Sequence, residues 1–258
     1  MKKIVLSALL LMISWTMMKA EVSHAIGLQV GFERQLYMLN SPSAKDGKTH
    51  LNKEPLNGAK LGFVYEATFI KGFGLYTALN YSFTGHTSNW GVIEVPDKVV
   101  PGQYHPSYQY EYKYKAEAHT LDLNLEFQYK FEIAGNTYLT LLTGPSAQFI
   151  AKYDAKDFFR DKISGQEIEK LPIYVIGYNA DEMEKYYKRW NVSWGIGAGF
   201  QYDRYYLRFT YNFGLVNPYT KDAFKEMDIP YDCEDRLTRG RLDDWSIRLG
   251  VFLWSSDK

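Results

Sequence analysis

The amino-acid sequence predicts an all-β protein, an eight-stranded antiparallel up-and-down transmembrane β-barrel with long extracellular loops. Three observations lead to this fold class. Apolar and polar side chains alternate in segments of about 12 residues, the connections between these segments are alternately short and long, and the N-terminus has the pattern of a secretory signal. A tilted membrane strand needs about 9–11 residues, so each segment is long enough to cross a bilayer once.

Eight alternating segments are found along the chain. They cover residues 26–37, 57–70, 74–86, 118–132, 137–151, 191–202, 205–216 and 243–254. Branched and aromatic side chains dominate one face of nearly every segment, as strands with one apolar face require. With an even number of strands, both ends of the barrel chain lie on the same side of the membrane.

The connections between the segments differ in length in a regular way. Three are tight turns, at 71–74, 133–136 and 203–204, and four are long, at 38–56, 87–117, 152–190 and 217–242. In an up-and-down barrel this order places every long connection at one end. Outer-membrane barrels have short periplasmic turns and longer extracellular loops, so we expect an outer-membrane location with periplasmic termini.

The polar face of the segments carries charges of both signs. The charged positions are Glu33, Lys60, Glu66, Asp122, Glu126, Lys130, Arg208 and Arg248. An eight-stranded barrel fills its interior with side chains, and a buried charge is costly unless it is paired. The sequence therefore predicts a luminal ionic network that plugs the barrel, with the apolar face toward lipid.

The alternation by itself leaves a second fold open, a secreted lipocalin-like barrel that turns its apolar face inward around a ligand. Two features favour the membrane barrel. The polar face is rich in glycine, at Gly195, Gly197, Gly199 and Gly250, which suits a crowded lumen. Aromatic residues lie at both ends of the apolar face, as in the two interfacial girdles of membrane barrels.

The first residues form a candidate signal peptide. A charged start precedes an apolar run at 4–18, which is shorter than the about 20 residues of a spanning helix. We expect cleavage after Ala20 or Ala25, and the residues before Ala25 agree better with the rule of small residues at the cleavage site. The chain then divides into a signal peptide at 1–25 and a barrel domain at 26–258.

The stretch "YQYEYKYKAEAHTLDLNLEFQYKF" alternates throughout but changes character near residue 119. Below that point the exterior positions are apolar and face lipid, and above it they are charged and face water and lipopolysaccharide. The interior positions above it are tyrosines. We expect a hairpin at 88–116 whose inner face carries Trp90, Tyr108, Tyr110, Tyr112 and Tyr114, because residues two apart share one face of a strand. Tyrosine is common at recognition surfaces, so this face is a candidate binding site for a protein or glycan partner.

Composition excludes several function classes. The chain has 30 Lys and Arg against 30 Asp and Glu, so it lacks the basic excess of a nucleic-acid-binding protein. Cys233 is the single cysteine, which rules out a disulfide framework within the chain. The acidic segment at 217–242 does not have the spacing of a twelve-residue Ca²⁺ loop. No metal or cofactor is expected.

The histidines do not form a catalytic group. His50 and His105 fall in long connections, whereas the alternation points His86 inward and His119 outward. No nucleophile, base and orienting group therefore converge, and we do not expect an enzyme.

Two stretches resemble a known family. "LDLNLEFQYKFEIAGNTYLTLLTGPS" and the terminal "SIRLGVFLW" are similar to strands of the outer-membrane β-barrel family of Gram-negative bacteria, which includes PorT-like and OmpA-like eight-stranded barrels. The resemblance implies insertion by the barrel assembly machinery, which reads the last strand. It also implies an alternative role as the barrel component of a secretion or assembly machinery, as for PorT-like proteins.

Overall fold

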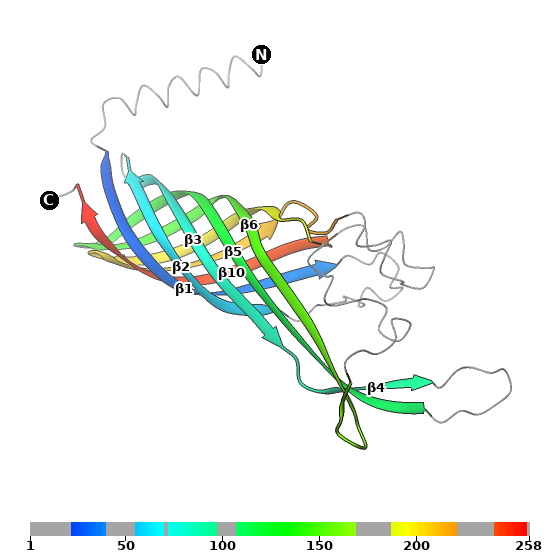
Figure 1. Cartoon of the computed structure of the whole chain (residues 1–258). Helices are drawn as coiled ribbons and strands as arrows, with labels where there is room; N and C mark the ends of the chain where they lie inside the picture. Colours follow the sequence, from blue (N-terminus) through cyan, green and yellow to red (C-terminus); the bar gives the residue numbers. More distant parts are fainter. Residues whose placement is uncertain are drawn as a thin grey trace, which may run out of the picture.

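A single antiparallel sheet closes on itself to form a β-barrel (Figure 1). The computed structural model describes residues 22–39, 55–69, 72–96, 107–168, 187–220 and 240–256. The barrel strands are β1 (Ser23–Leu39), β2 (Leu56–Thr68), β3 (Phe73–Thr87), β5 (Ser107–Ala134), β6 (Thr137–Asp161), β8 (Trp190–Tyr202), β9 (Tyr205–Gly214) and β10 (Gly240–Ser255). Two short strands, β4 (Gly91–Pro96) and β7 (Glu167–Ile168), lie beyond the barrel wall.

The ring is closed by the pairing of β1 with β10, which joins the two ends of the barrel sequence. β1 also pairs with β2, and β5 pairs with both β3 and β6. The other barrel neighbours follow in chain order. The eight predicted strands and their antiparallel up-and-down order are thus confirmed.

The barrel wall ends in tight turns on one side. Gly135, between β5 and β6, has a φ of 52°, and Asp203, between β8 and β9, has a φ of 50°. Glycine and aspartate are among the residues that tolerate this left-handed backbone, which lets two-residue hairpin connections follow the twist of the strands. β1 begins and β10 ends on this same side (Figure 1), where Ala25 pairs with Ser255.

The apolar face of the strands points out of the barrel. Phe63 is 69% exposed and Leu249 is 57% exposed, whereas Asp122 and Arg208 on the opposite face are 2% and 1% exposed. A barrel in water would bury its apolar face, so this arrangement requires lipid around the wall. The lipocalin-like alternative, with its apolar face inward, is wrong.

The interior is too crowded for side chains at some positions. A Cβ atom built on Gly250 would lie 2.1 Å from Cζ of Tyr206, so only glycine fits beneath that ring. Such close packing is expected inside an eight-stranded barrel. Across the part of the chain that the structure describes, no helix is long and apolar enough to cross a membrane.

Two strands, β5 and β6, are about ten residues longer than predicted, counted from their predicted bounds. β5 and β6 were expected at 118–132 and 137–151, but β5 begins at Ser107 and β6 ends at Asp161. They remain paired from Thr137 and Ala134 at the turn to Tyr110 and Asp161 at the far end. This two-stranded extension continues past the barrel rim and leans away from the barrel axis (Figure 1).

The predicted signal peptide falls largely on residues 1–21, outside the described residues, but its two candidate cleavage sites differ in their effect on β1. Ser23 pairs with Thr68 of β2, and the His24 amide donates to Ser256 Oγ at 2.8 Å. Cleavage after Ala25 would remove these paired residues from the wall.

We therefore expect signal peptidase to cut after Ala20, giving a mature protein that begins at Glu21. Intact-mass measurement of protein extracted from membranes checks this. A measured mass that corresponds to a chain beginning at Ile26 would contradict cleavage after Ala20, because β1 would then have lost part of its pairing with β2 and β10.

Candidate functional site

The interior nearest the tight turns, which we call the lower lumen, holds two ion-paired groups. Arg208 Nη2 lies 2.9 Å from Glu66 Oε2, and Lys130 pairs with the other oxygen of the same carboxylate. Arg248 Nη2 lies 3.1 Å from Glu126 Oε1. These side chains come from four strands, β2, β5, β9 and β10, and each reaches inward because its position shares the polar face.

Aromatic rings surround the arginines of the lower lumen. The Arg208 guanidinium carbon is 3.7 Å from the Tyr76 ring centroid and 4.7 Å from that of Tyr206. Tyr206 also packs on Phe252, and Val64 completes this small apolar cluster. The cation–π contacts favour the charged arginine at a place where it has little access to water.

The interior on the loop side, which we call the upper lumen, has a different charge balance. Lys60 Nζ lies 3.2 Å from Glu33 Oε1 and 2.9 Å from Asp122 Oδ2, so two carboxylates share one ammonium. Asp244 is also buried and accepts a 2.7 Å hydrogen bond from Asn212 Nδ2. The structure thus brings all eight predicted luminal residues into interior ion pairs.

Asp244 is a luminal residue that the sequence analysis missed. It lies in the last predicted strand, 243–254, but was not named among the luminal charges, and in the structure it is buried on the inward face of β10. Its even spacing from Arg248 could have revealed its orientation. With Asp244 included, the upper lumen has three carboxylates for one ammonium, whereas the lower lumen has two carboxylates for three cations.

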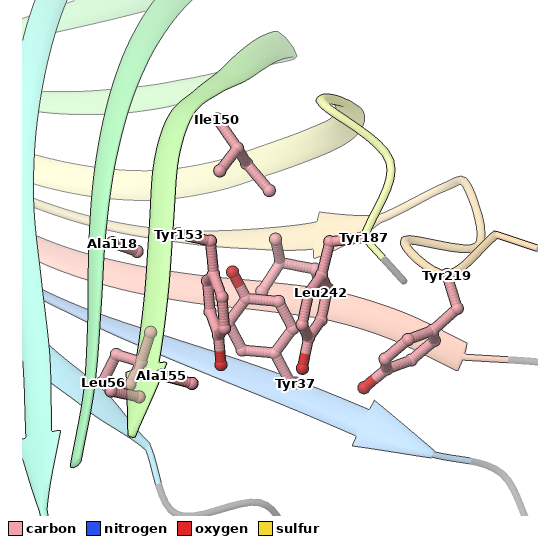
Figure 2. Packing of buried hydrophobic residues seen from close by; sticks show 10 residues of the cluster. Tyr37, Leu56, Ala118, Ile150, Tyr153, Ala155, Tyr187, Tyr219 and Leu242 are labelled. Carbon is pink, nitrogen blue, oxygen red and sulfur yellow. The ribbon is translucent and has the colours of Figure 1, made fainter. Parts of the chain in front are cut away.

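A cluster of tyrosines lies over the upper lumen (Figure 2). The ring centroids of Tyr153 and Tyr187 are 4.5 Å apart, those of Tyr37 and Tyr187 are 5.2 Å apart, and those of Tyr187 and Tyr219 are 5.3 Å apart. Leu242 and residues of β2, β5 and β6 complete the cluster. We call this group the aromatic cap.

The aromatic cap is held partly by residues from the long connections. Tyr187 and Tyr219 form an isolated β-bridge, and the Lys188 amide donates to the Pro218 carbonyl at 2.7 Å. Burial raises the pKa of the Tyr187 hydroxyl well above its usual range, so this ring stays neutral. No periodic pattern marks these two tyrosines, because they lie outside the predicted strands.

The extension above the rim is a ribbon of three main strands, β4, β5 and β6. β4 pairs with β5 from Gly91 opposite Tyr112 to Pro96 opposite Ser107. Residues 152–161 of β6, predicted to belong to a long connection, pair with the other edge of β5.

The inner side of this ribbon carries the predicted residues Tyr110, Tyr112 and Tyr114. The ring of Tyr112 lies 5.5 Å from that of Phe159, and Tyr114 Oη lies 3.2 Å from Tyr153 Oη, where the ribbon joins the aromatic cap. Tyr110 is half-buried in the same row, and the backbone of Tyr108 pairs with Val95.

Trp90 is not on the tyrosine side, and its predicted orientation is corrected. The Arg160 guanidinium carbon lies 4.3 Å from the Trp90 ring centroid and Lys113 Nζ lies 5.7 Å from it, which places the ring on the opposite side of the ribbon. The cause is a slip of one residue. β3 places Thr87 opposite Lys115, whereas β4 places Gly91 opposite Tyr112.

Ser88 explains this slip. Its hydroxyl accepts a 2.9 Å hydrogen bond from the Tyr114 amide, so a side chain replaces the backbone carbonyl that would continue the ladder. A shift of one residue turns every following side chain to the other face of a strand.

The remaining candidate groups are spread apart. His119 lies on the exterior, where its ring packs 5.0 Å from Phe83 and its Nδ1 is 2.5 Å from Tyr81 Oη. His50, His105, Cys233 and most of the acidic segment at 217–242 lie outside the described residues. Among the residues that are described, no group of three or more His, Cys, Asp and Glu is arranged to hold a metal ion.

Comparison with known proteins gives a family match over most of the barrel. Residues 20–218 match the family described as outer membrane protein beta-barrel domain. No curated protein matches the chain significantly.

Several solved structures are similar in architecture. Ail of Yersinia pestis, in complex with the heparin analogue sucrose octasulfate, is 14% identical with a TM-score of 0.34, covering 89% of this chain and 97% of that chain. OprG from Pseudomonas aeruginosa is 10% identical with a TM-score of 0.35, covering 89% of this chain and 92% of that chain. The Neisserial surface protein A is 10% identical with a TM-score of 0.29, covering 88% of this chain and 97% of that chain.

Proposed function

Because the chain belongs to the outer membrane β-barrel domain family, we propose that it binds a partner outside the cell through its ribbon while its lumen stays closed. The observation that carries this proposal is the ribbon itself. β5 and β6 remain paired from His119 opposite Lys152 to Tyr110 opposite Asp161, beyond the last β6–β8 pair at Phe149 and Trp190. A solvated loop would not need this pairing.

The orientation that we propose follows from the two ends of the barrel. The tight turns and the termini lie in the periplasm, and the ribbon and the aromatic cap lie outside the cell. The protein is then surrounded by outer-membrane lipid and lipopolysaccharide and inserted by the barrel assembly machinery. This proposal includes no enzymatic activity, cofactor or nucleic acid.

A closed lumen is supported by what fills it. The ion pairs occupy the middle, the aromatic cap covers the loop side, and the cluster around Tyr76, Tyr206 and Phe252 covers the turn side. We expect no single-channel conductance from the purified protein in planar lipid bilayers. Steady conductance in the wild-type protein would show a water-filled interior and would overturn the plug.

The tyrosine side of the ribbon is the proposed binding face. Its residues are Tyr108, Tyr110 and Tyr112, whereas Tyr114 is partly taken up by its contact with Tyr153. Tyrosine provides a rigid ring with a polar tip, which suits contact with either a protein or a glycan.

A triple variant in which Ser replaces Tyr108, Tyr110 and Tyr112 should lose binding to the partner surface. Barrel insertion should still occur. The three residues lie above the lipid band, so the wall should still form. Whole-cell binding and heat-dependent migration on gels measure the two properties separately. The matched control replaces Ile163, Gln166 and Glu167 with Ser, because these exposed residues lie at the β6–β7 turn of the same ribbon and outside the row of tyrosines.

Unchanged binding in the tyrosine variant would remove this face from the proposal. Pull-down of the detergent-solubilised protein distinguishes a second role. Stable co-purification with a set of secretion or assembly proteins would favour a component of such a machinery instead of an independent binding protein.

A further inference from the structure

The exterior side of the ribbon is the upward continuation of the lipid-facing wall. Leu121, which is 43% exposed to the lipid side, is followed along β5 by exterior positions at His119, Glu117 and Lys115. We call the upper part of this side the basic exterior face. Its members are Trp90, Lys113, Lys115, Lys152, Lys156 and Arg160.

Carboxylates neutralise only part of the charge on this face. The ion pairs are Arg160 with Glu111, Lys115 with Glu117 at 2.6 Å, and Lys152 with Asp154 at 3.5 Å. Among the described side chains, no carboxylate lies within ion-pair distance of Lys113 or Lys156. Counted over the described side chains, the face carries the five cations Lys113, Lys115, Lys152, Lys156 and Arg160 against the three carboxylates Glu111, Glu117 and Asp154.

The two strands also place like charges side by side. Lys115 and Lys156 are directly opposite each other in the β5–β6 pair. Like charges at such positions destabilise a sheet, unless an anion lies between or above them. Phosphate is an anion that lysine binds as a point charge.

Apolar side chains are interleaved with these cations. Phe158 is 40% exposed, Val92 is 51% exposed and Trp90 is 37% exposed, with Arg160 and Lys113 lying over the Trp90 ring. Tryptophan, lysine and arginine together are typical of the region where a membrane meets water. The opposite side of the ribbon, with its tyrosines, lacks this mixture.

We propose that the basic exterior face binds the phosphate groups of the glycolipid that forms the surrounding outer leaflet. The location of the basic exterior face favours the outer leaflet as the source of phosphate. The face continues directly from the lipid-facing wall, and the cations of the face lie just above Leu121. This goes beyond the proposed partner binding, since it uses the other side of the ribbon and a different ligand. It would fix the angle at which the ribbon presents its tyrosines.

The test titrates the full-length protein in detergent with purified lipopolysaccharide, with the same lipopolysaccharide after phosphate removal, and with phosphatidylcholine. Binding is followed by microscale thermophoresis. Replacing Lys113, Lys115 and Lys156 with Gln should weaken lipopolysaccharide binding by about 100-fold, since lysines near an anionic surface contribute independently. Removing phosphate from the lipopolysaccharide should weaken its binding to the wild-type protein to a similar extent. It should leave the binding to the variant unchanged.

The matched control replaces Lys162, Lys188 and Arg204 with Gln, which gives the same change in net charge away from the Lys115–Lys156 row. Equal binding by the two triple variants would overturn the proposal, as would equal affinity for the phosphate-free glycolipid. Heparin that competes as strongly as lipopolysaccharide would assign the face to a soluble polyanion instead. Heat-dependent gel migration, measured in parallel, shows whether each variant is a folded barrel, independently of any binding.

Discussion

Replacing Lys60 with Met is expected to lower the free energy of unfolding by about 5 kcal/mol, because two buried carboxylates lose their shared counterion. Lys60 is 3% exposed and contacts Glu33 at 3.2 Å and Asp122 at 2.9 Å. Asp244, which pairs in register with Gln35, adds a third acidic group to the same region. Urea unfolding of the protein inserted in lipid vesicles measures this loss.

The pH dependence of the same variant separates loss of charge from loss of packing. At low pH the stranded carboxylates take up protons and no longer need a cation. The difference in stability between Lys60→Met and the wild-type protein should therefore shrink as the pH falls. A difference that stays constant with pH, or one within the about 0.5 kcal/mol typical of exposed substitutions, would contradict the proposed charge pairing.

Replacing Glu126 with Ala is expected to cost about 3–5 kcal/mol, because Arg248 would keep its charge in the lumen without a carboxylate. Arg248 is 1% exposed, and its Nη2 is 3.1 Å from Glu126 Oε1. The loss should be smaller than that of Lys60→Met, since Thr210 still accepts a hydrogen bond from the stranded guanidinium. The same vesicle unfolding experiment gives the comparison.

Two control variants make this test specific. Combining Glu126→Leu with Arg248→Met removes both charges, and this pair should recover most of the lost stability, because apolar replacement of a whole buried pair is often neutral. Replacing Glu117 with Ala breaks an exterior ion pair with Lys115 and should leave stability nearly unchanged. If Glu126→Ala lowers the free energy of unfolding no more than Glu117→Ala does, water fills the lower lumen and the ion pair there is not buried.

The strand pattern could be predicted because it is a local property. Asp122, Asn124 and Glu126 alternate with leucines, and a period of two is enough to assign each side chain to a face. The exposure of the leucines and the burial of the acidic residues follow this pattern in the structure. The alternation of short and long connections then gave the closed up-and-down order.

Features that depend on contacts between distant segments could not be predicted in this way. Residues 152–161 contain "KYDAKDFFRD", in which the alternation is too weak to show a strand, yet they pair with β5 above the rim. Tyr187 and Tyr219 come together only because their segments meet over the barrel mouth. Sequence periodicity carries no signal for either arrangement.

The sequence by itself determined which residues of each barrel strand face lipid and which face the lumen, because that choice follows from alternation within one strand. The tertiary structure decided how the strands and the segments above them are registered. The orientation of Trp90 shows the difference, since Ser88 accepts a hydrogen bond from Tyr114 and shifts the pairing by one residue. A pairing register is set between strands, through hydrogen bonds whose partners are far apart in the chain, so the pattern of a single strand does not contain it.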